Sequence, residues 1–252
     1  MALRLALWHR RWARSKGTAF AVRAGSGLLS RAPAARGQSR TMLLQVHVQM
    51  MHLALDRVVS ARALGQMIRA NLQVDFPWNQ FGRHELHFDN NAFDRADAHL
   101  AEQRRRIQPA LQAGRAHEAW SAFGRLAHTV QDFYSHTNYV DLWMAAQSQG
   151  RLPPAPQIDP LDDRLLSSAA LCSGRPYLPW GFLSFVPLIG GWVDTLLPAD
   201  SHAQMHLDSP ARGPRFEYAF QAAVKRTRAE FEFLARTLPA GLLSRFRDLA
   251  VP

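Results

Sequence analysis

The spacing of apolar side chains along this chain restricts its fold more than any other feature. In residues 42–72 the apolar positions follow one another at intervals of mainly three and four: Leu43, Val46, Met50, Leu53, Ala54, Leu64, Met67 and Ile68. Such intervals place apolar groups on one face of an α-helix. No stretch of the sequence alternates with a period of two for long enough to indicate a sheet. The sequence therefore predicts an all-α fold.

Residues that begin and end helices divide the chain further. Ser60 is a good N-cap and predicts two helices within residues 42–72. A loop is expected to open at residues 76–79. A third helix is expected at about residues 94–113, where Gly114 ends it, and a long fourth helix at about residues 116–147. The last helix is expected at about residues 215–237.

The formal net charge of +10 suggests a nucleic-acid-binding protein, but the distribution of charge argues against it. Residues 1–41 hold nine Arg or Lys and no acid, which leaves 21 basic and 20 acidic side chains in residues 42–252. The leader composition is typical of an organellar transit peptide, of a translated stretch before a true start at Met42, or of a short basic arm. We expect residues 1–41 to contribute little to the core and residues 42–252 to form a single domain.

The composition excludes several classes of protein. With 47% apolar residues the chain can bury a full core, so a disordered or fibrous protein is excluded. Cys172 is the single cysteine, which excludes an intramolecular disulfide framework and cysteine-rich zinc or iron–sulfur sites. Metal sites built from histidine and aspartate remain compatible with this composition.

An uncharged, irregular segment spans residues 176–193. It contains three prolines, three glycines and the bulky apolar side chains of Trp180, Phe182, Phe185 and Trp192. It is too broken for a transmembrane helix, which needs about 20 uninterrupted apolar residues. Two interpretations remain open, a buried irregular loop and a substrate lid or membrane-contacting loop.

Three potential metal ligands share one face of the predicted fourth helix. His128, Asp132 and His136 follow one another at intervals of four residues, so they fall within an arc of about 80° over two turns. Gly124, Gln131 and Ser135 flank this stripe and are expected to leave room for ions beside it. Imidazole and carboxylate ligands together suit zinc better than calcium or magnesium. The alternative is a polar helix face with an Asp–His hydrogen bond.

Further histidine clusters favour the metal site over that alternative. The run His84-Glu85-Leu86-His87-Phe88-Asp89 follows Asp75, and His202 and His206 repeat the four-residue interval before the last helix. His47 lies on the first predicted helix.

The run Gly-Arg-Leu-Ala-His-Thr-Val-Gln-Asp-Phe-Tyr-Ser-His-Thr-Asn-Tyr-Val-Asp at residues 124–141 resembles the central motif of the heterokaryon-incompatibility Het-C family. That family is akin to the zinc-dependent phospholipases C and the fungal zinc nucleases. Three flanking motifs match in the same order, namely His47 with Ala54-Leu55, His87-Phe88-Asp89-Asn90, and Ser201-His202 with Asp208-Ser209-Pro210. The resemblance covers about residues 42–238.

This resemblance implies a multi-helix bundle in which several helices contribute ligands to as many as three zinc ions, with an irregular apolar loop beside them. For a first ion it implies Asp75, His87, His128 and Asp132, with Asp132 able to bridge. A second ion would take His136, His202 and either His206 or Asp208, and a third would take His47.

The implied function is a zinc-dependent phosphodiester hydrolase, phospholipase C-like, that acts on phospholipid at a membrane surface. Zinc lowers the pKa of a bound water to about 7, and Asp75 or Asp89 would orient that water or accept its proton. The near-neutral body makes nucleic acid the less favoured partner. The alternatives are a single-strand nuclease on the same scaffold and a non-catalytic, metal-stabilised interaction protein. Without a clear secretory signal, a cytoplasmic or membrane-peripheral location is favoured, or organellar import if the leader is a transit peptide.

Overall fold

A computed structural model of the chain describes residues 40–80, 82–147, 152–177 and 196–249. Within these ranges the regular elements are helices, and the β-type pairings are two isolated bridges. The prediction of an all-α, multi-helix bundle is therefore confirmed. Almost all of the predicted leader, and most of the apolar segment 176–193, lie outside the described residues.

The first two helices are α2 (Arg40–Leu55) and α3 (Ala61–Leu72), as predicted. Ser60 ends the turn between them, and its hydroxyl accepts a hydrogen bond from the backbone N–H of Ala63 at 3.0 Å. This bond satisfies one of the N–H groups that a helix leaves free at its start.

Three short elements follow α3, where the sequence indicated a loop. They are the 3-10 helix η1 (Gln73–Asp75), α4 (Pro77–Gln80) and α5 (His84–His87). Pro77 occupies the first position of α4, where its fixed φ suits a helix and its missing N–H costs nothing.

Two long helices come next, α6 (Phe93–Gln112) and α7 (Ala116–His136). Gly114 separates them with a φ of +72°, a left-handed conformation that glycine adopts without strain. The predicted helix at 116–147 is wrong in its length, because α7 ends at His136 and a separate helix, α8 (Tyr139–Ala146), follows. Thr137 makes the break, since it is extended and its hydroxyl donates to the carbonyl of Phe133 at 2.6 Å.

The remaining elements are η2 (Ala155–Gln157), α9 (Asp163–Leu166), α12 (His202–Met205), η3 (Pro210–Arg212), α13 (Pro214–Thr237) and α14 (Ala240–Arg247). The predicted last helix corresponds to α13, and α14 comes after it. The indole N–H of Trp120 on α7 donates to the carbonyl of Phe246 at 2.8 Å and so fastens α14 to the bundle.

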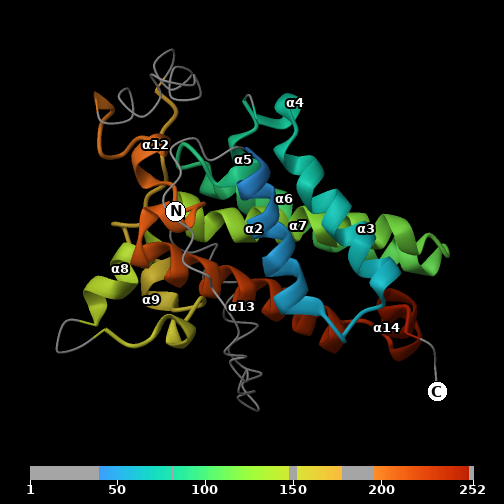
Figure 1. Cartoon of the computed structure of the whole chain (residues 1–252). Coiled ribbons are helices and arrows are strands. Elements are labelled where there is room, and N and C mark those ends of the chain that lie inside the picture. The colour runs from blue at the N-terminus through green and yellow to red at the C-terminus, as the bar shows by residue number, and fades with distance from the viewer. Residues whose placement is uncertain (1–39, 81, 148–151, 178–195, 250–252) are drawn as a thin grey trace.

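Helix α7 runs through the middle of the bundle and packs against α3, α6 and α13, while α2 lies across α13 and α3 (Figure 1). Every residue of α7 from Leu126 to His136 is buried. Polar side chains on a helix buried on all sides need partners inside the protein, because an unpaired polar group there is costly. The central helix thus carries polar groups that other elements must satisfy.

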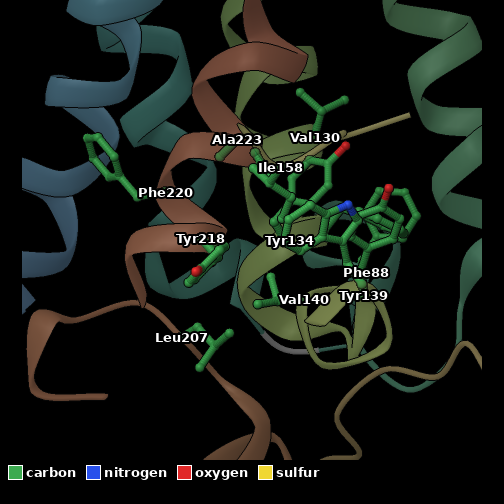
Figure 2. Close-up of a cluster of buried hydrophobic side chains, with 14 of the residues drawn as sticks. Phe88, Val130, Tyr134, Tyr139, Val140, Ile158, Leu207, Tyr218, Phe220 and Ala223 are labelled. Atoms are coloured by element: carbon green, nitrogen blue, oxygen red, sulfur yellow. The ribbon is translucent and has the colours of Figure 1, made fainter. Parts of the chain in front are cut away.

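Two clusters of apolar side chains surround this helix. The one drawn in Figure 2 includes Phe88, Val130, Tyr134 and Tyr139. The hydroxyls of Tyr134 and Tyr139 donate to the carbonyls of Pro160 and Asp159, each at 2.6 Å, and so hold the irregular segment before α9 against the core. The other cluster joins α2, α3, α6 and α14 to the first half of α7.

Gly124 lets α3 approach α7 closely. A Cβ atom at this position would lie 2.2 Å from the carbonyl oxygen of Met67 on α3, so only glycine fits without movement of a backbone. The expectation that Gly124 leaves room for ions is wrong, because a neighbouring helix fills that space.

Among the described helices, none combines the length and the apolar character that a bilayer crossing demands.

Candidate metal centre

The predicted stripe on α7 is fully inside the protein. His128, Asp132 and His136 are 0%, 2% and 7% exposed. Side chains from elements that precede and follow α7 in the sequence face each of them, and they form two clusters. The first cluster consists of His47, Asp75, His87, His128 and Asp132, and the second of Asp89, His136, His202 and Asp208.

Asp132 is the centre of the first cluster. Its Oδ1 lies 3.3 Å from Nε2 of His47, and its Oδ2 lies 2.8 Å from Nδ1 of His87 and 3.0 Å from Nε2 of His128. Asp75 adds a second carboxylate, with one oxygen 3.6 Å from Nε2 of His128 and the other 4.0 Å from Nε2 of His47. The helix α2, the 3-10 helix η1, the short helix α5 and α7 therefore meet at one point.

A layer of amide side chains orients the first cluster from behind. Nδ1 of His47 donates to Oε1 of Gln131 at 2.8 Å, and the amide of Asn71 donates to the same oxygen at 3.0 Å. Gln131 in turn donates to the hydroxyl of Thr227 at 3.1 Å. Nδ1 of His128 lies 3.4 Å from Oδ1 of Asn71. Such bonds fix which ring nitrogen faces the cluster.

These supporting residues were missed in the sequence. Asn71 and Thr227 are completely buried, and each is a polar residue at a position where its helix turns toward the core. A polar residue at a core-facing position of a helix was therefore the sequence signal that could have identified them. The expectation that Gln131 leaves room for ions is wrong, because its amide hydrogen-bonds three other side chains within the site.

Asp89 joins the second cluster. Its Oδ1 lies 2.9 Å from Nδ1 of His202 and 3.3 Å from Nδ1 of His136. Nε2 of His136 lies 3.4 Å from Oδ1 of Asp208, while its Nδ1 donates to the carbonyl of His87 at 3.0 Å. The rings of His136 and His202 meet edge to face with centroids 4.6 Å apart.

An unusual backbone holds Asp89 in place. Phe88, Asn90 and Asn91 have φ values of 55°, 55° and 53°, so three residues around Asp89 are left-handed. Such conformations cost about 1–3 kcal/mol each when the residue is not glycine, and they persist where surrounding contacts enforce them. Here the enforcing contacts come from Ser173, whose hydroxyl accepts from the N–H of Asn91 at 2.8 Å and whose N–H donates to the Asn91 side chain at 2.7 Å.

The next residue, Gly174, connects three parts of the second cluster. Its N–H donates to the carbonyl of His136 at 3.0 Å, and its carbonyl accepts from the N–H of Asn90 at 2.7 Å. A Cβ atom on Gly174 would lie 2.6 Å from Cα of His202, so the absence of a side chain allows α12 to approach. The segment 173–175 therefore aligns the elements that carry Asp89, His136 and His202.

One predicted ligand points elsewhere. His206 follows α12, and both of its ring nitrogens face the guanidinium of Arg212, at 2.9 and 2.7 Å, with Nδ1 also 3.0 Å from the carbonyl of His202. Burial and the nearby positive groups lower the pKa of His206 to about 4. Of His206 and Asp208, the two alternatives for a ligand of the second ion, Asp208 is the residue that reaches the second cluster.

The carboxylates dominate the electrostatics of the first cluster. Burial lowers the pKa of His47, but the hydrogen bond and charge of Asp132 outweigh it and raise the pKa to about 9. The pKa of His87 is raised against the effect of burial by the same carboxylate. Burial disfavours ionised Asp132, yet the charges of His128 and His136 hold its pKa well below the usual range.

The second cluster shows the same balance. Burial opposes ionisation of Asp89 and Asp208, but the pKa of Asp89 is lowered by His202 and His136 and that of Asp208 by His136. The pKa of His136 lies well above its ordinary value, because these carboxylates outweigh its burial. Ionised carboxylates thus gather inside the protein with protonated imidazoles as their counter-charges. A divalent cation would supply the same positive charge.

The donor set fits a metal ion. Three triads have ligand atoms within 4.8 Å of one another: His47, Asp75 and His128; His87, His128 and Asp132; and Asp89, His136 and His202. Nε2 of His87 is also buried without a hydrogen-bond partner among the described residues, so protein contacts satisfy this imidazole incompletely. Asp75 and Asp89, predicted to act on a bound water, lie among the potential ligands themselves.

Comparison with known proteins places this chain in a family. Residues 45–175 match the model of the VWA7 N-terminal domain. The von Willebrand factor A domain-containing protein 7 of Homo sapiens is 29% identical over 136 residues, which cover 54% of this chain and 15% of that protein. The protein of the same name from Rattus norvegicus is 38% identical over 87 residues, which cover 32% of this chain and 9% of the relative. No solved structure matches.

The family match corrects the interpretation of the motifs. The resemblance to the Het-C family is wrong, because the segment that carries its central motif belongs to a match with another family. The expected function, a zinc-dependent, phospholipase C-like phosphodiester hydrolase, is wrong with it, since the similar proteins are von Willebrand factor A domain-containing proteins. The match covers more than half of the sequence and contains seven of the nine residues of the two clusters. This chain belongs to the family of the VWA7 N-terminal domain.

Proposed function

We propose that this chain is a metal-binding domain in which the two His/Asp clusters hold two or three zinc ions. The observation that carries the proposal is the convergence, within 4.8 Å, of nitrogen and oxygen donors in three triads from elements far apart in the sequence. A mixed set of imidazoles and carboxylates matches the ligands that zinc prefers, whereas calcium and magnesium prefer oxygen.

The shared ligands limit the number of ions. Nε2 of His128 lies 3.6 Å from Asp75 and 3.0 Å from Asp132, and it has one lone pair to donate. The first cluster therefore holds one ion through His128. A further ion in this cluster would use His47 and the second carboxylate oxygen of Asp132. The second cluster offers Asp89, His136 and His202, with Asp208 beside them.

The ions would stabilise the fold, because they connect elements too short to be stable alone. His87 lies on α5 and His202 on α12, and both helices have four residues. An isolated helix of this length is unstable in water. Metal binding that occurs in the folded state alone adds its free energy to the stability of that state.

The test is a zinc titration of the full chain after treatment with a chelator. We expect at least two tightly bound zinc ions per chain by calorimetry. At free zinc about 1,000 times the dissociation constant, each occupied site adds about 4 kcal/mol of stability, a rise in melting temperature of about 10 °C for each ion. Magnesium at the same concentration is the control and should change the melting temperature little. Fewer than two bound zinc ions, or an equal effect of magnesium, would contradict the proposal.

The open side of the first cluster favours a second candidate function, the binding of an external ligand to the metal. The Asp75 side chain is 23% exposed, in contrast to the 3% of Asp132. Phe76 and Trp78 follow Asp75, and their rings meet edge to face with centroids 4.9 Å apart. Trp78 is 71% exposed, so it offers an aromatic surface three residues along the chain from the partly exposed Asp75.

Two metal-chelating probes test this second candidate. Benzohydroxamate carries an aromatic ring and acetohydroxamate does not, so the aromatic surface should favour the former in the zinc-loaded protein. Replacing Trp78→Ala should remove this preference and leave acetohydroxamate binding unchanged. The matched control is Leu53→Ala, which removes another exposed apolar side chain. If neither compound binds the zinc-loaded protein, the metal has no accessible position and the candidate fails.

A further inference from the structure

A surface groove between α6 and α7 shares no residue with the two metal clusters. Its volume is about 560 Å³, and it is lined by α6 from Glu102 to Ala110, by Arg115 and by the first part of α7. This volume lies in the range of small-molecule binding sites, about 300–1,000 Å³. Charged and polar residues predominate in the lining, Pro109 and Ala110 are its apolar residues, and no aromatic side chain takes part apart from the imidazole of His117.

Positive charge predominates in this groove. Four arginines line it, namely Arg105, Arg106, Arg115 and Arg125. Two carboxylates, those of Glu102 and Glu118, oppose them and leave a formal charge of +2. Residues 42–252, with the groove included, are nearly neutral, with 21 basic and 20 acidic side chains, so this groove concentrates charge that the body as a whole lacks.

The ion pairs within the groove are exposed and exchangeable. Glu102 pairs with both Arg105 and Arg106, and Glu118 pairs with Arg115 at 2.9 Å. The three arginine side chains are all more than half exposed. Exposed pairs of this kind contribute about 0–1 kcal/mol. An oxyanion that accepts hydrogen bonds from several guanidinium groups at once could therefore displace them.

Arg125 differs from the other three arginines. It is half-buried, and its Nε donates to the neutral amide oxygen of Gln103 at 3.0 Å. No carboxylate among the described residues forms an ion pair with it. Burial lowers the pKa of Arg125, and the charge of Arg106 lowers it further, so the two guanidinium groups repel each other. An anion between them would relieve this repulsion.

We infer that this groove binds a small polyanion, a polyol esterified with several phosphate or sulfate groups. Clustered oxyanions match the arginines, whose planar guanidinium groups bind such groups through paired hydrogen bonds. The lining has no aromatic ring apart from the imidazole of His117, which argues against a nucleobase, since nucleobases are held by stacking.

Calorimetry on the full chain with two probes tests this inference. Inositol hexakisphosphate presents phosphate esters and sucrose octasulfate presents sulfate esters, so the two probes cover both kinds of ester. Binding should weaken as salt is added. Replacing Arg125→Gln should weaken binding about tenfold, the loss expected for a charged hydrogen bond. Replacing Glu118→Gln should tighten binding severalfold, because it removes an opposing charge from an exposed position.

Arg164→Gln is the matched control. Arg164 is an exposed arginine paired with Asp162 outside the groove, so its loss lowers the net charge equally and should leave binding unchanged. The arginines in residues 1–41 are common to all variants and cannot produce a difference between them. The inference is overturned if neither probe binds, or if Arg125→Gln and Glu118→Gln bind as Arg164→Gln does.

Discussion

Nδ1 of His87 lies 2.8 Å from Oδ2 of Asp132, and the other ring nitrogen of His87 is buried without a hydrogen-bond partner among the described residues. Asp132 contacts His47 and His128 as well, so one carboxylate joins three imidazoles from three helices. The charge of Asp132 should therefore control the whole first cluster.

Replacing Asp132→Asn should abolish zinc binding in the first cluster and leave the second cluster loaded. The variant keeps the size of the side chain but loses the negative charge that both the imidazoles and a cation require. Metal analysis after dialysis should show about one zinc fewer per chain, or two fewer if His47 holds a third ion, and the stabilisation by zinc should decrease in proportion. The control is Asp141→Asn, an exposed aspartate paired with Arg215. Equal zinc contents in the two variants would contradict the central role of Asp132.

Replacing Gly174→Ala should affect the second cluster in particular. The new Cβ would lie 2.6 Å from Cα of His202, so α12 must move away from Asp89 and His136. We expect the loss of one zinc ion, as for Asp89→Asn, while the first cluster keeps its ion. Zinc titrations of the two variants measure this directly. A Gly174→Ala variant with the full zinc content would show that the position of α12 does not determine binding.

Two glycines on neighbouring helices should respond in opposite ways to the same substitution. Gly124→Ala places a Cβ atom 2.2 Å from the carbonyl oxygen of Met67 and should destabilise the protein by about 1–3 kcal/mol. Gly65→Ala on α3 meets no atom within 4 Å and should stabilise it by as much as about 1 kcal/mol, through helix propensity. Urea denaturation of both variants provides the comparison. A stable Gly124→Ala variant would show that α3 and α7 can separate without cost.

The sequence predicted those helices and helix boundaries that depend on residues close together in the chain. Apolar spacing located α2 and α3, the helices expected at about residues 94–113 and 215–237 correspond to α6 and α13, and Ser60 and Gly114 marked boundaries through their own chemistry. The break between α7 and α8 was not predictable in this way. Thr137 leaves the helix to form a bridge with Ser173, a residue 36 positions away in the chain.

The site was likewise predicted in part, because some of its geometry is local and the rest depends on contacts between residues far apart in the chain. The stripe of His128, Asp132 and His136 follows from helix geometry. The position of Asp89 beside His136 and His202 depends on left-handed residues that Ser173 holds in place, and the turn of His206 toward Arg212 is likewise a tertiary contact. The motif was misassigned to a family because histidine and aspartate at intervals of four need only lie on one helix face, and so short a pattern does not identify a family.

A buried ion-pair network is another feature that the sequence alone did not predict. Arg104 lies in a run of three arginines that reads as a solvated helix face. Its guanidinium instead donates to Glu230 on α13 at 2.9 and 3.0 Å. Arg226 donates to the same carboxylate at 2.9 Å, and Glu230 is 1% exposed. Two cations thus surround one buried anion between α6 and α13.

Replacing Glu230→Gln should destabilise the protein in a way that depends on pH. Burial opposes ionisation of Glu230, but Arg104 and Arg226 lower its pKa from 4.5 to about 2. A carboxyl group with a lowered folded-state pKa stabilises the protein above pH 4.5 by about 3 kcal/mol, and this contribution disappears as the pH falls toward 2. Denaturation of the variant and the wild type should therefore differ by about that amount at pH 7 and converge in acid. Glu232→Gln, which removes the exposed partner of Arg228, is the control and should show little difference at either pH. A constant difference between Glu230→Gln and the wild type from pH 7 to pH 2 would show that packing, and not charge, accounts for the loss.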